Sequence, residues 1–318
     1  MYSNSPVNGN ENSAGKPLAL VGWSMLGDPL SIEALGRAGF DFVGLDVQHG
    51  FFGFESTVRA IQQLDAMGVP AFVRINCREI DKLPHYLDAG ASGAIIAMVT
   101  GPEDAALAVR LSRYQPKGAR SYGGQRYGLR PEPADVADVQ PSIYVMIETS
   151  EAARRVNEIA AVPQISGLYV GPVDLSLALG VPADRTDHDF DAALSEVISA
   201  AHAQRIQAGT FATCGADARE LAAMGFDEVV ISSDIALLRA SLNEELADAR
   251  RPVKDGVPTT THRIHVGLAE STNDRAHSRS PPDGRWSTQR FFFKFAPSRR
   301  PNQGRHSSAP RGASEHGL

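Results

Sequence analysis

Two carboxylates, Glu148 and Asp174, each stand just beyond a short apolar stretch of the sequence. Residues 143–147 read IYVMI and lead into Glu148, and residues 167–171 read GLYVG and end three positions before Asp174. With no cysteine or second histidine close by, such a pair suits a hard divalent cation such as Mg²⁺, which prefers oxygen ligands and leaves positions for water or substrate. The alternative is that each acid caps the helix that follows it. The spacing leaves both hypotheses open.

His49 is a candidate general base. It follows the apolar stretch 42–47, within the sequence DVQHG, and is one of four histidines in residues 1–253. A neutral imidazole near pH 7 suits proton transfer, whereas a lone histidine after a strand is more often an ordinary loop residue. Both interpretations stay open from the sequence.

Arg74 lies at the end of another apolar stretch, residues 71–75. A guanidinium at the inner end of a buried strand needs an anionic partner, and it recognises a carboxylate or an enolate well through paired hydrogen bonds. The alternative partner is a side chain of the protein, either Asp46 or Glu148. Arg74 is therefore expected to bind substrate or to form an internal ion pair.

The elements that would position these residues alternate between strands and helices. Short, continuous runs rich in valine and isoleucine are typical of strands covered on both faces. Such runs occupy residues 18–23, 42–47, 71–75, 93–99, 143–147, 167–171, 208–211 and 228–232. Helical spacing of apolar residues covers 54–67, 79–89, 102–113, 188–204, 215–224 and 234–249, with starts near Ser56, Pro102, Asp187 and Asp234.

Eight strand–helix repeats within residues 17–251 predict an α/β fold, a (β/α)8 TIM barrel. A doubly wound sheet is the second choice, but no glycine-rich dinucleotide turn follows the first strand. In a barrel the C-terminal ends of the strands meet on one face, where active sites lie. The residues expected to share that rim are Asp46, His49, Arg74, Glu148 and Asp174.

The rest of the composition limits the kinds of partner. Residues 1–253 contain 20 Lys+Arg and 32 Asp+Glu, whereas residues 254–318 contain 11 and 5. The acidic main part argues against nucleic-acid binding, and the lack of a run of about 18 apolar residues argues against a membrane span. Two cysteines and a polar N-terminus fit a cytoplasmic protein. We expect a disordered segment at 1–16, the barrel at 17–251 and a disordered, basic, low-complexity tail at 252–318.

Six phrases of the sequence together resemble a known family. They are GFDFVGLDVQHG, FVRI, LDAGASGAIIAMV, RYQPKGARSYG, VMIET and GPVDLS. In this order and spacing they resemble the HpcH/HpaI family of metal-dependent class II aldolases, which act on 2-keto-3-deoxy sugar acids and 4-hydroxy-2-oxoheptanedioate. The resemblance covers about residues 20–250. It implies a homo-oligomer, a hexamer in which C-terminal helices are exchanged between subunits, although docking of that helix on its own barrel looks the same from sequence.

The resemblance also implies roles for individual residues. His49 would act as the base, Arg74 would steady the enolate, and Asp88 would raise the basicity of the histidine, sometimes across a subunit boundary. Glu148 and Asp174 would bind Mg²⁺, or Mn²⁺ or Co²⁺ in its place. The implied substrate-contacting residues are Arg74, Met146, Gly171, Pro172, Val173 and Asp174, with the Val173 amide holding the substrate carboxylate.

Met146 departs from the family pattern, because many relatives have a glutamine at this position. Ala97 likewise stands where a proline is common. A thioether cannot donate a hydrogen bond to a keto acid. The departure puts the substrate preference or the catalytic rate in question, while the expected metal pair, arginine and histidine are all present.

The sequence thus predicts a divalent-metal-dependent lyase that reversibly cleaves a 2-keto-3-deoxy or 4-hydroxy-2-oxo acid into pyruvate and an aldehyde. Lys82 and Lys117 lie in helix or loop patterns rather than at strand ends, which disfavours a Schiff-base aldolase. One alternative is an acyl-CoA lyase of the citrate lyase β or malyl-CoA type on the same fold, although that group usually lacks the Gly171-Pro172 form. Another is a non-catalytic barrel, which Met146 and the unusual tail motivate.

Overall fold

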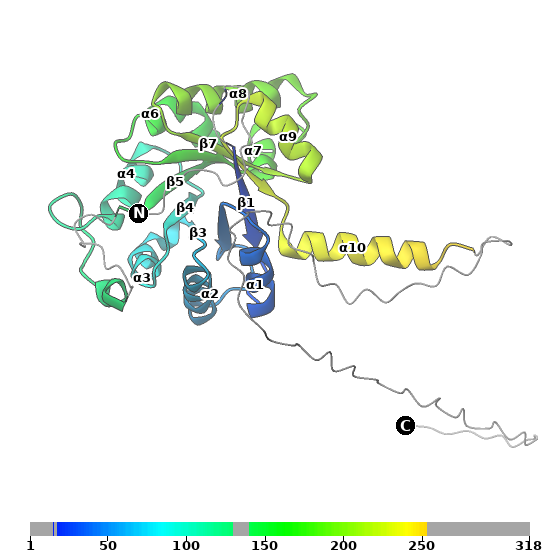
Figure 1. Ribbon diagram of the computed structural model, residues 1–318. Coiled ribbons are helices and arrows are strands. Elements are labelled where there is room, and N and C mark those ends of the chain that lie inside the picture. Colours follow the sequence, from blue (N-terminus) through cyan, green and yellow to red (C-terminus); the bar gives the residue numbers. More distant parts are fainter. Residues whose placement is uncertain (1–14, 16–17, 130–139, 253–318) are drawn as a thin grey trace, which may run out of the picture. The chain divides into compact units, whose positions relative to one another are not determined.

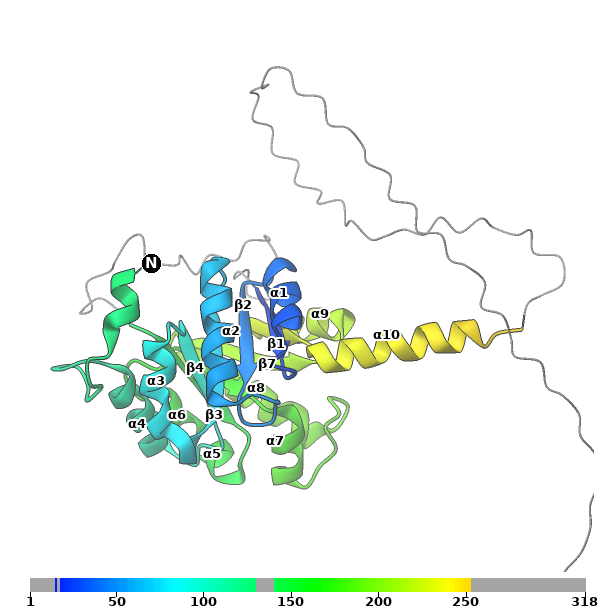
Figure 2. The same ribbon diagram turned by 90° about the horizontal axis from the view of Figure 1, so that it is seen from below.

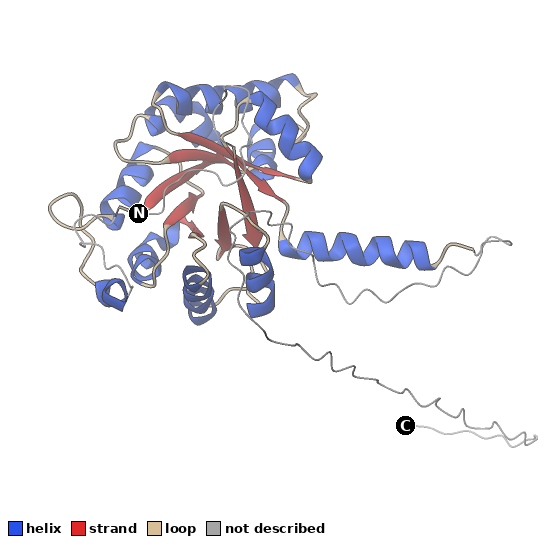
Figure 3. Cartoon of the chain, in the orientation of Figure 1, coloured by secondary structure: helices blue, strands red, loops and turns tan. Residues whose placement is uncertain are grey.

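Eight parallel strands close into a barrel in the computed structural model, which describes residue 15 and residues 18–129 and 140–252. Each strand pairs with the next one along the chain, and the last pairs with the first. Helices surround the barrel (Figures 1 and 3). The predicted (β/α)8 TIM barrel is confirmed. The disordered segments expected at 1–16 and 252–318 lie outside the described residues, apart from Gly15 and Pro252, and stay predictions.

The element bounds agree closely with the apolar pattern of the sequence. The strands are β1 (Ala19–Ser24), β2 (Phe42–Asp46), β3 (Ala71–Asn76), β4 (Gly93–Ala97), β5 (Ser142–Ile147), β6 (Gly167–Val170), β7 (Gln207–Ala212) and β8 (Glu228–Ile231). The α-helices are α1 (Pro29–Arg37), α2 (Phe54–Ala66), α3 (Leu83–Asp88), α4 (Pro102–Ser112), α5 (Ser150–Arg154), α6 (Val156–Ala160), α7 (Pro172–Leu179), α8 (His188–Ala203), α9 (Gly215–Met224) and α10 (Asp234–Ala249). Two 3-10 helices complete the set, η1 (Cys77–Lys82) and η2 (Gly124–Leu129).

The helix predicted over residues 79–89 is instead divided into η1 and α3. Glu79 has non-helical dihedral angles (φ −110°, ψ 21°), and Pro84 lies in the first turn of α3, where a missing N–H costs no helical hydrogen bond. The strand predicted over 93–99 ends at Ala97 because the next residue leaves the extended conformation.

Capping side chains fix several helix starts. Asp187 is the N-cap of α8, as the sequence indicates, and accepts hydrogen bonds from two backbone N–H groups. Ser56 and Asp234 lie near helix starts but are not the caps. Gly53 caps α2, with the Ser56 hydroxyl accepting its N–H at 2.9 Å, and Ser233 caps α10. Asp234 is therefore the first residue of its helix, which leaves its carboxylate available for other partners.

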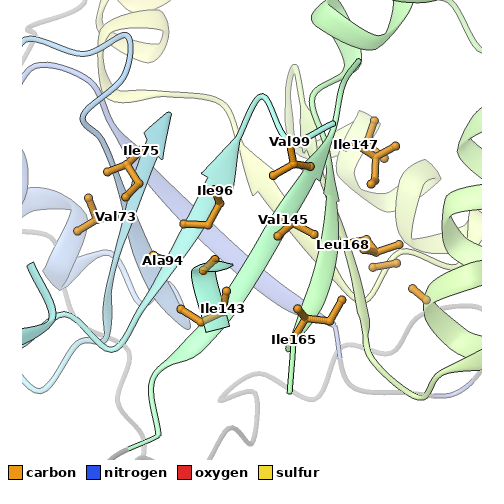
Figure 4. Close-up of a cluster of buried hydrophobic side chains, with 14 of the residues drawn as sticks. Val73, Ile75, Ala94, Ile96, Val99, Ile143, Val145, Ile147, Ile165 and Leu168 are labelled. Atoms are coloured by element: carbon orange, nitrogen blue, oxygen red, sulfur yellow. The ribbon is translucent and has the colours of Figure 1, made fainter. Parts of the chain in front are cut away.

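The barrel wall separates two apolar clusters. The larger cluster combines residues of the strands with residues of the surrounding helices. Figure 4 shows part of it, where Val73 and Ile75 of β3 lie beside Ala94 and Ile96 of β4. The smaller cluster fills the barrel and comes mainly from the alternate strand residues. Its members are Val21, Trp23, Phe42, Phe72, Ile95, Ala97, Tyr144, Met146, Tyr169 and Val230.

Helix α10 differs from the other long helices because, within the described part of the chain, none of its residues is buried. Figures 1 and 2 both show it extending away from the barrel. Leu238, Leu242 and Leu246 recur every four residues along it and are 49%, 60% and 49% exposed. Among the described residues, no helix combines the length and apolar character that crossing a bilayer requires.

Candidate active site

Arg74 is the centre of a buried charge cluster at the C-terminal ends of the strands. Its Nη1 lies 3.2 Å from Oδ2 of Asp46, the last residue of β2. Its Nη2 lies 3.6 Å from Oε2 of Glu148, which follows β5. All three side chains are buried. The structure therefore contains the internal ion pair that the sequence offered as an alternative, and it contains it with both acids at once.

Glu148 is the most deeply buried acid of this rim, with 2% of its surface exposed. Its Oε1 accepts the N–H of Met98 at 2.6 Å, whereas its Oε2 has no hydrogen-bond partner among the described residues. Burial raises the pKa of Glu148, and the Arg74 charge and the Met98 N–H act to lower it. The N-cap of α5 is Thr149, so Glu148 does not cap that helix.

Asp174 occupies the first turn of α7 and lies near Glu148. The N-cap of α7 is Gly171, and the cap has no side-chain hydrogen bond, so Asp174 is not the cap either. Its negative charge is one of the influences that raise the pKa of Glu148. The backbone between the two acids is closely approached, because a Cβ at Gly171 would collide with Glu148 Oε2. A side chain at position 171 would therefore have to displace the Glu148 carboxylate.

The two carboxylates fit a divalent cation on the chemistry of their donor set. Glu148 offers a buried oxygen without a hydrogen bond, and Asp174 supplies a second carboxylate beside it. In the described part of the chain, no group of three or more His, Cys, Asp or Glu residues could hold a metal. Two protein carboxylates with water or substrate filling the remaining positions is the arrangement that Mg²⁺ favours.

His49 lies in the loop between β2 and α2, and its side chain is exposed. Its backbone N–H donates to Asp46 Oδ1 at 2.9 Å. The charge of the His49 side chain is the least of the influences given for the pKa of Glu148, and it acts to lower that pKa. The structure thus brings Asp46, Arg74 and Glu148 into direct contact, while the charges of Asp174 and His49 act on the same Glu148 carboxylate.

Met146 and the start of α7 also belong to this site. The Met146 thioether is buried, and its Sδ accepts the Arg74 Nε–H at 3.3 Å. Pro172 is the first residue of α7 and Val173 the second, with a Val173 side chain that is 62% exposed. The first N–H groups of a helix have no acceptor within it, so the Val173 amide is available to an anion. The substrate-binding roles expected for these residues stay predictions.

Asp88 does not meet His49 within one chain. It ends α3, on the side where β4 begins, at the opposite end of the barrel from the rim. Its Oδ1 lies 2.5 Å from Arg120 Nη2, and the Arg120 guanidinium lies over the Tyr114 ring. The role of Asp88 across a subunit boundary therefore stays a prediction.

Two further residues, Met98 and Trp23, contact the acids of the rim and carry no signal of this in the sequence. Met98 has a positive φ of 61°, its N–H donates to Glu148, and its carbonyl accepts the Cys77 thiol at 3.1 Å. Trp23 donates its indole N–H to Asp46 Oδ2 at 3.3 Å. Neither residue type signals these roles. Methionine rarely adopts a left-handed conformation, and a tryptophan at this position has the sequence context of an ordinary strand residue.

Comparison with known proteins covers the whole barrel. The family model described as HpcH/HpaI aldolase/citrate lyase matches residues 20–241. The hydroxypyruvate/pyruvate aldolase of Rhizorhabdus wittichii is 35% identical over 240 residues, covering 74% of this chain and 95% of that protein. The 5-keto-4-deoxy-D-glucarate aldolase of Escherichia coli K12 is 31% identical over 239 residues, covering 74% and 93%. A solved HpcH/HpaI aldolase/citrate lyase family protein from Burkholderia cenocepacia has a TM-score of 0.68 at 28% identity, covering 75% of this chain and 97% of that chain.

Proposed function

Because the chain belongs to the HpcH/HpaI aldolase/citrate lyase family, we propose that it is a divalent-metal-dependent lyase that reversibly cleaves a 4-hydroxy-2-oxo acid into pyruvate and an aldehyde. The observation that carries the proposal is the burial and hydrogen bonding of the Glu148 carboxylate. Its carboxylate is buried beside Arg74 and Asp174, and one of its oxygens has no hydrogen bond among the described residues. The aldolase names of the relatives in Rhizorhabdus and Escherichia support the same reaction class.

Glu148 and Asp174 are the residues that would hold the cation. Their oxygen donors favour Mg²⁺, and Mn²⁺ or Co²⁺ could replace it. When bound, the ion supplies Lewis-acid polarisation of the keto acid and compensates negative charge. The nearby Arg74 remains permanently charged, so the site holds a cationic group of its own in addition to the ion.

Three groups of the protein would carry out proton transfer, enolate stabilisation and substrate binding. His49 accepts the proton of the C4 hydroxyl as the C3–C4 bond breaks and the aldehyde forms. Arg74 stabilises the enolate oxygen of the pyruvate that is left, because a buried guanidinium interacts strongly with developing negative charge. The Val173 amide binds the substrate carboxylate at the start of α7. Protonation of the enolate then gives pyruvate.

The lysines of the described residues do not support a Schiff-base mechanism. Lys82 ends η1 and pairs with Glu79 at 2.5 Å. Lys117 lies in the loop after α4. Neither stands at the C-terminal end of a strand, where a covalent intermediate with the substrate would have to form.

The test is a cleavage assay on the full-length chain with a panel of 2-keto-3-deoxy acids. Pyruvate release is measured after treatment with EDTA and after Mg²⁺, Mn²⁺ or Co²⁺ is restored. We expect activity to vanish with EDTA and to return with at least one metal. Full activity in excess EDTA would contradict the proposal. A parallel assay with CoA thioesters tests the acyl-CoA lyase alternative, which predicts cleavage of a thioester. Binding of pyruvate without turnover of any keto acid would favour a non-catalytic barrel.

We further propose that the protein is a homo-oligomer assembled through α10. Leu238, Leu242 and Leu246 form an exposed apolar stripe on α10. Within the described part of the chain, no residue of this helix is buried. Light scattering should give a mass of several chains for the full-length protein and a smaller mass for Leu242→Asp. An unchanged mass in this variant would contradict the role of the stripe.

A further inference from the structure

Asp234, the first residue of α10, has more hydrogen-bond partners than a helix start requires. Its Oδ1 accepts the Met25 N–H at 2.9 Å and, within its own helix, the Ile235 N–H at 2.8 Å. Its Oδ2 accepts the hydroxyls of Ser24 and Ser31 at 2.9 and 2.8 Å and the Leu26 N–H at 3.3 Å. The cap of α10 is already supplied by the preceding serine. The carboxylate therefore serves mainly to hold the β1–α1 loop, which contains Met25 and Leu26.

The segment held by Asp234 is also the support of the His49 loop. The Met25 carbonyl accepts the Phe51 N–H at 2.7 Å. A Cβ at Gly50 would lie 2.8 Å from the same carbonyl oxygen and would collide with the Asp46 carbonyl oxygen. The loop that carries His49 is thus packed directly on Met25 and leaves no room for a side chain at position 50.

The same loop is connected to the buried charge cluster from its other side. The His49 N–H donates to Asp46 Oδ1, and Asp46 is ion-paired with Arg74. Met25 also packs against the apolar cluster inside the barrel. The backbone at His49 is therefore held on one side by Asp46, which accepts the N–H groups of His49 and Gly50, and on the other side through Phe51 by Met25.

We propose that Asp234 is a positioning residue for the reaction, because it fixes Met25 and through it the loop that places His49. The inference rests on the proposed function, in which His49 takes up the substrate proton. Proton transfer depends strongly on placement, and a displacement of about 1 Å can lower a rate by up to roughly 100-fold. A carboxylate that accepts bonds from four groups of one segment is suited to prevent such a displacement.

A purely structural role for Asp234 makes different predictions. In that case, its removal would lower the free energy of unfolding while each folded molecule kept its rate. Asp187 provides a matched control, because its carboxylate also accepts two backbone N–H groups at a helix start, and both of these bonds stay within the start of α8. Both residues lose a comparable negative charge when they are changed to asparagine.

The experiment compares full-length wild type, Asp234→Asn and Asp187→Asn by hydrogen exchange with mass spectrometry and by steady-state kinetics of pyruvate release. We expect Asp234→Asn to speed amide exchange in residues 47–53 and to lower kcat by roughly tenfold with KM within about twofold. Asp187→Asn should leave both readings unchanged. Unchanged exchange in 47–53, or an unchanged kcat despite faster exchange, would overturn the proposal.

A second variant covers the case in which Asp234→Asn does not fold. Ser31→Ala removes one of the hydrogen bonds to Asp234 and should produce the same pattern, with a fall in kcat of about two- to threefold. No effect of Ser31→Ala on loop exchange would also count against the proposal. If the wild type cleaves no keto acid, the proposed function fails, and the exchange data still decide whether Asp234 holds the loop.

Discussion

Two buried glutamates at opposite ends of the barrel have opposite surroundings. Burial is the main cause that raises the pKa of both. Glu148, at the C-terminal end, has the Arg74 guanidinium beside it. Glu228, at the N-terminal end, has its pKa raised to about 7 by burial and by the negative charge of Asp227, although the Tyr144 hydroxyl that it accepts at 2.6 Å acts to lower that pKa. The comparison teaches that burial disfavours the ionised form of both acids, and that only Glu148 has a guanidinium beside it that favours the ionised form.

Strand β5 joins these two ends. Its alternate residues Tyr144 and Met146, and Glu148 directly after it, recur with the two-residue period of a strand. Tyr144 bonds to Glu228 at the floor, Met146 contacts Arg74 in the middle, and Glu148 belongs to the rim. One strand therefore links the Glu228 end of the barrel, where Tyr144 bonds to the acid, to the Glu148 end, where a guanidinium lies beside the acid.

The largest expected effect separates the two glutamates directly. Glu148→Gln removes one of the two proposed metal ligands and should lower kcat/KM by roughly 1,000-fold, because several kcal/mol of charge stabilisation are lost. Glu228→Gln is the matched control and should keep activity near the wild-type level. Pyruvate release by both variants is the measurement. An equal loss of kcat/KM in the two variants would contradict a special role for the Glu148 end of the barrel.

Arg74→Lys should give the next largest effect. Lysine keeps the charge but cannot reach Asp46, Glu148 and Met146 Sδ together, as the guanidinium does. We expect kcat to fall by roughly 100-fold, as for loss of one group that stabilises a developing oxyanion. The fall in kcat is measured by steady-state kinetics at saturating metal. A wild-type rate in this variant would show that only charge matters at this position.

Glu228 predicts a pH dependence of stability with a defined sign. Its folded pKa of about 7 lies above the ordinary value of 4.5, so the folded state binds the proton more tightly than the unfolded state. The stability contributed by that proton is present below pH 4.5 and is lost as the pH rises to 7, with a total of about 3 kcal/mol.

Urea unfolding at pH 5 and pH 8 checks this prediction against Glu228→Gln, which cannot ionise. The variant should gain stability relative to wild type at pH 8, and the gain should be small at pH 5. A difference between the two proteins that does not change with pH would exclude an ionising Glu228.

Met146→Gln should give the smallest effect. An amide oxygen accepts the Arg74 Nε–H better than a thioether does, and the amide N–H₂ adds a donor for the keto acid. We expect KM for the keto acid to fall by roughly fivefold, the equivalent of about 1 kcal/mol for one added hydrogen bond. Met146→Leu, with no acceptor, is the control. A KM that is the same in all three proteins would mean that this side chain does not contact substrate.

The sequence predicts the residues whose positions follow from strand ends. Asp46, Arg74 and Glu148 lie together because parallel strands in a barrel all end on one face. Contacts made by the backbone could not be predicted in the same way, since the Met98 N–H that binds Glu148 belongs to a residue with no chemical signal. The Arg120 partner of Asp88 comes from a distant loop, and pairings of that kind depend on tertiary structure.

Met98 has a consequence for attempts to stabilise the protein. Its left-handed backbone costs roughly 1–2 kcal/mol compared with an ordinary conformation, and glycine would adopt the same angles without that cost. Substitution by glycine is thus a natural choice for a more heat-resistant enzyme. The same change would give more freedom to the backbone N–H that orients Glu148. A gain in stability against heat at this position would therefore come with a less precisely placed Glu148 carboxylate.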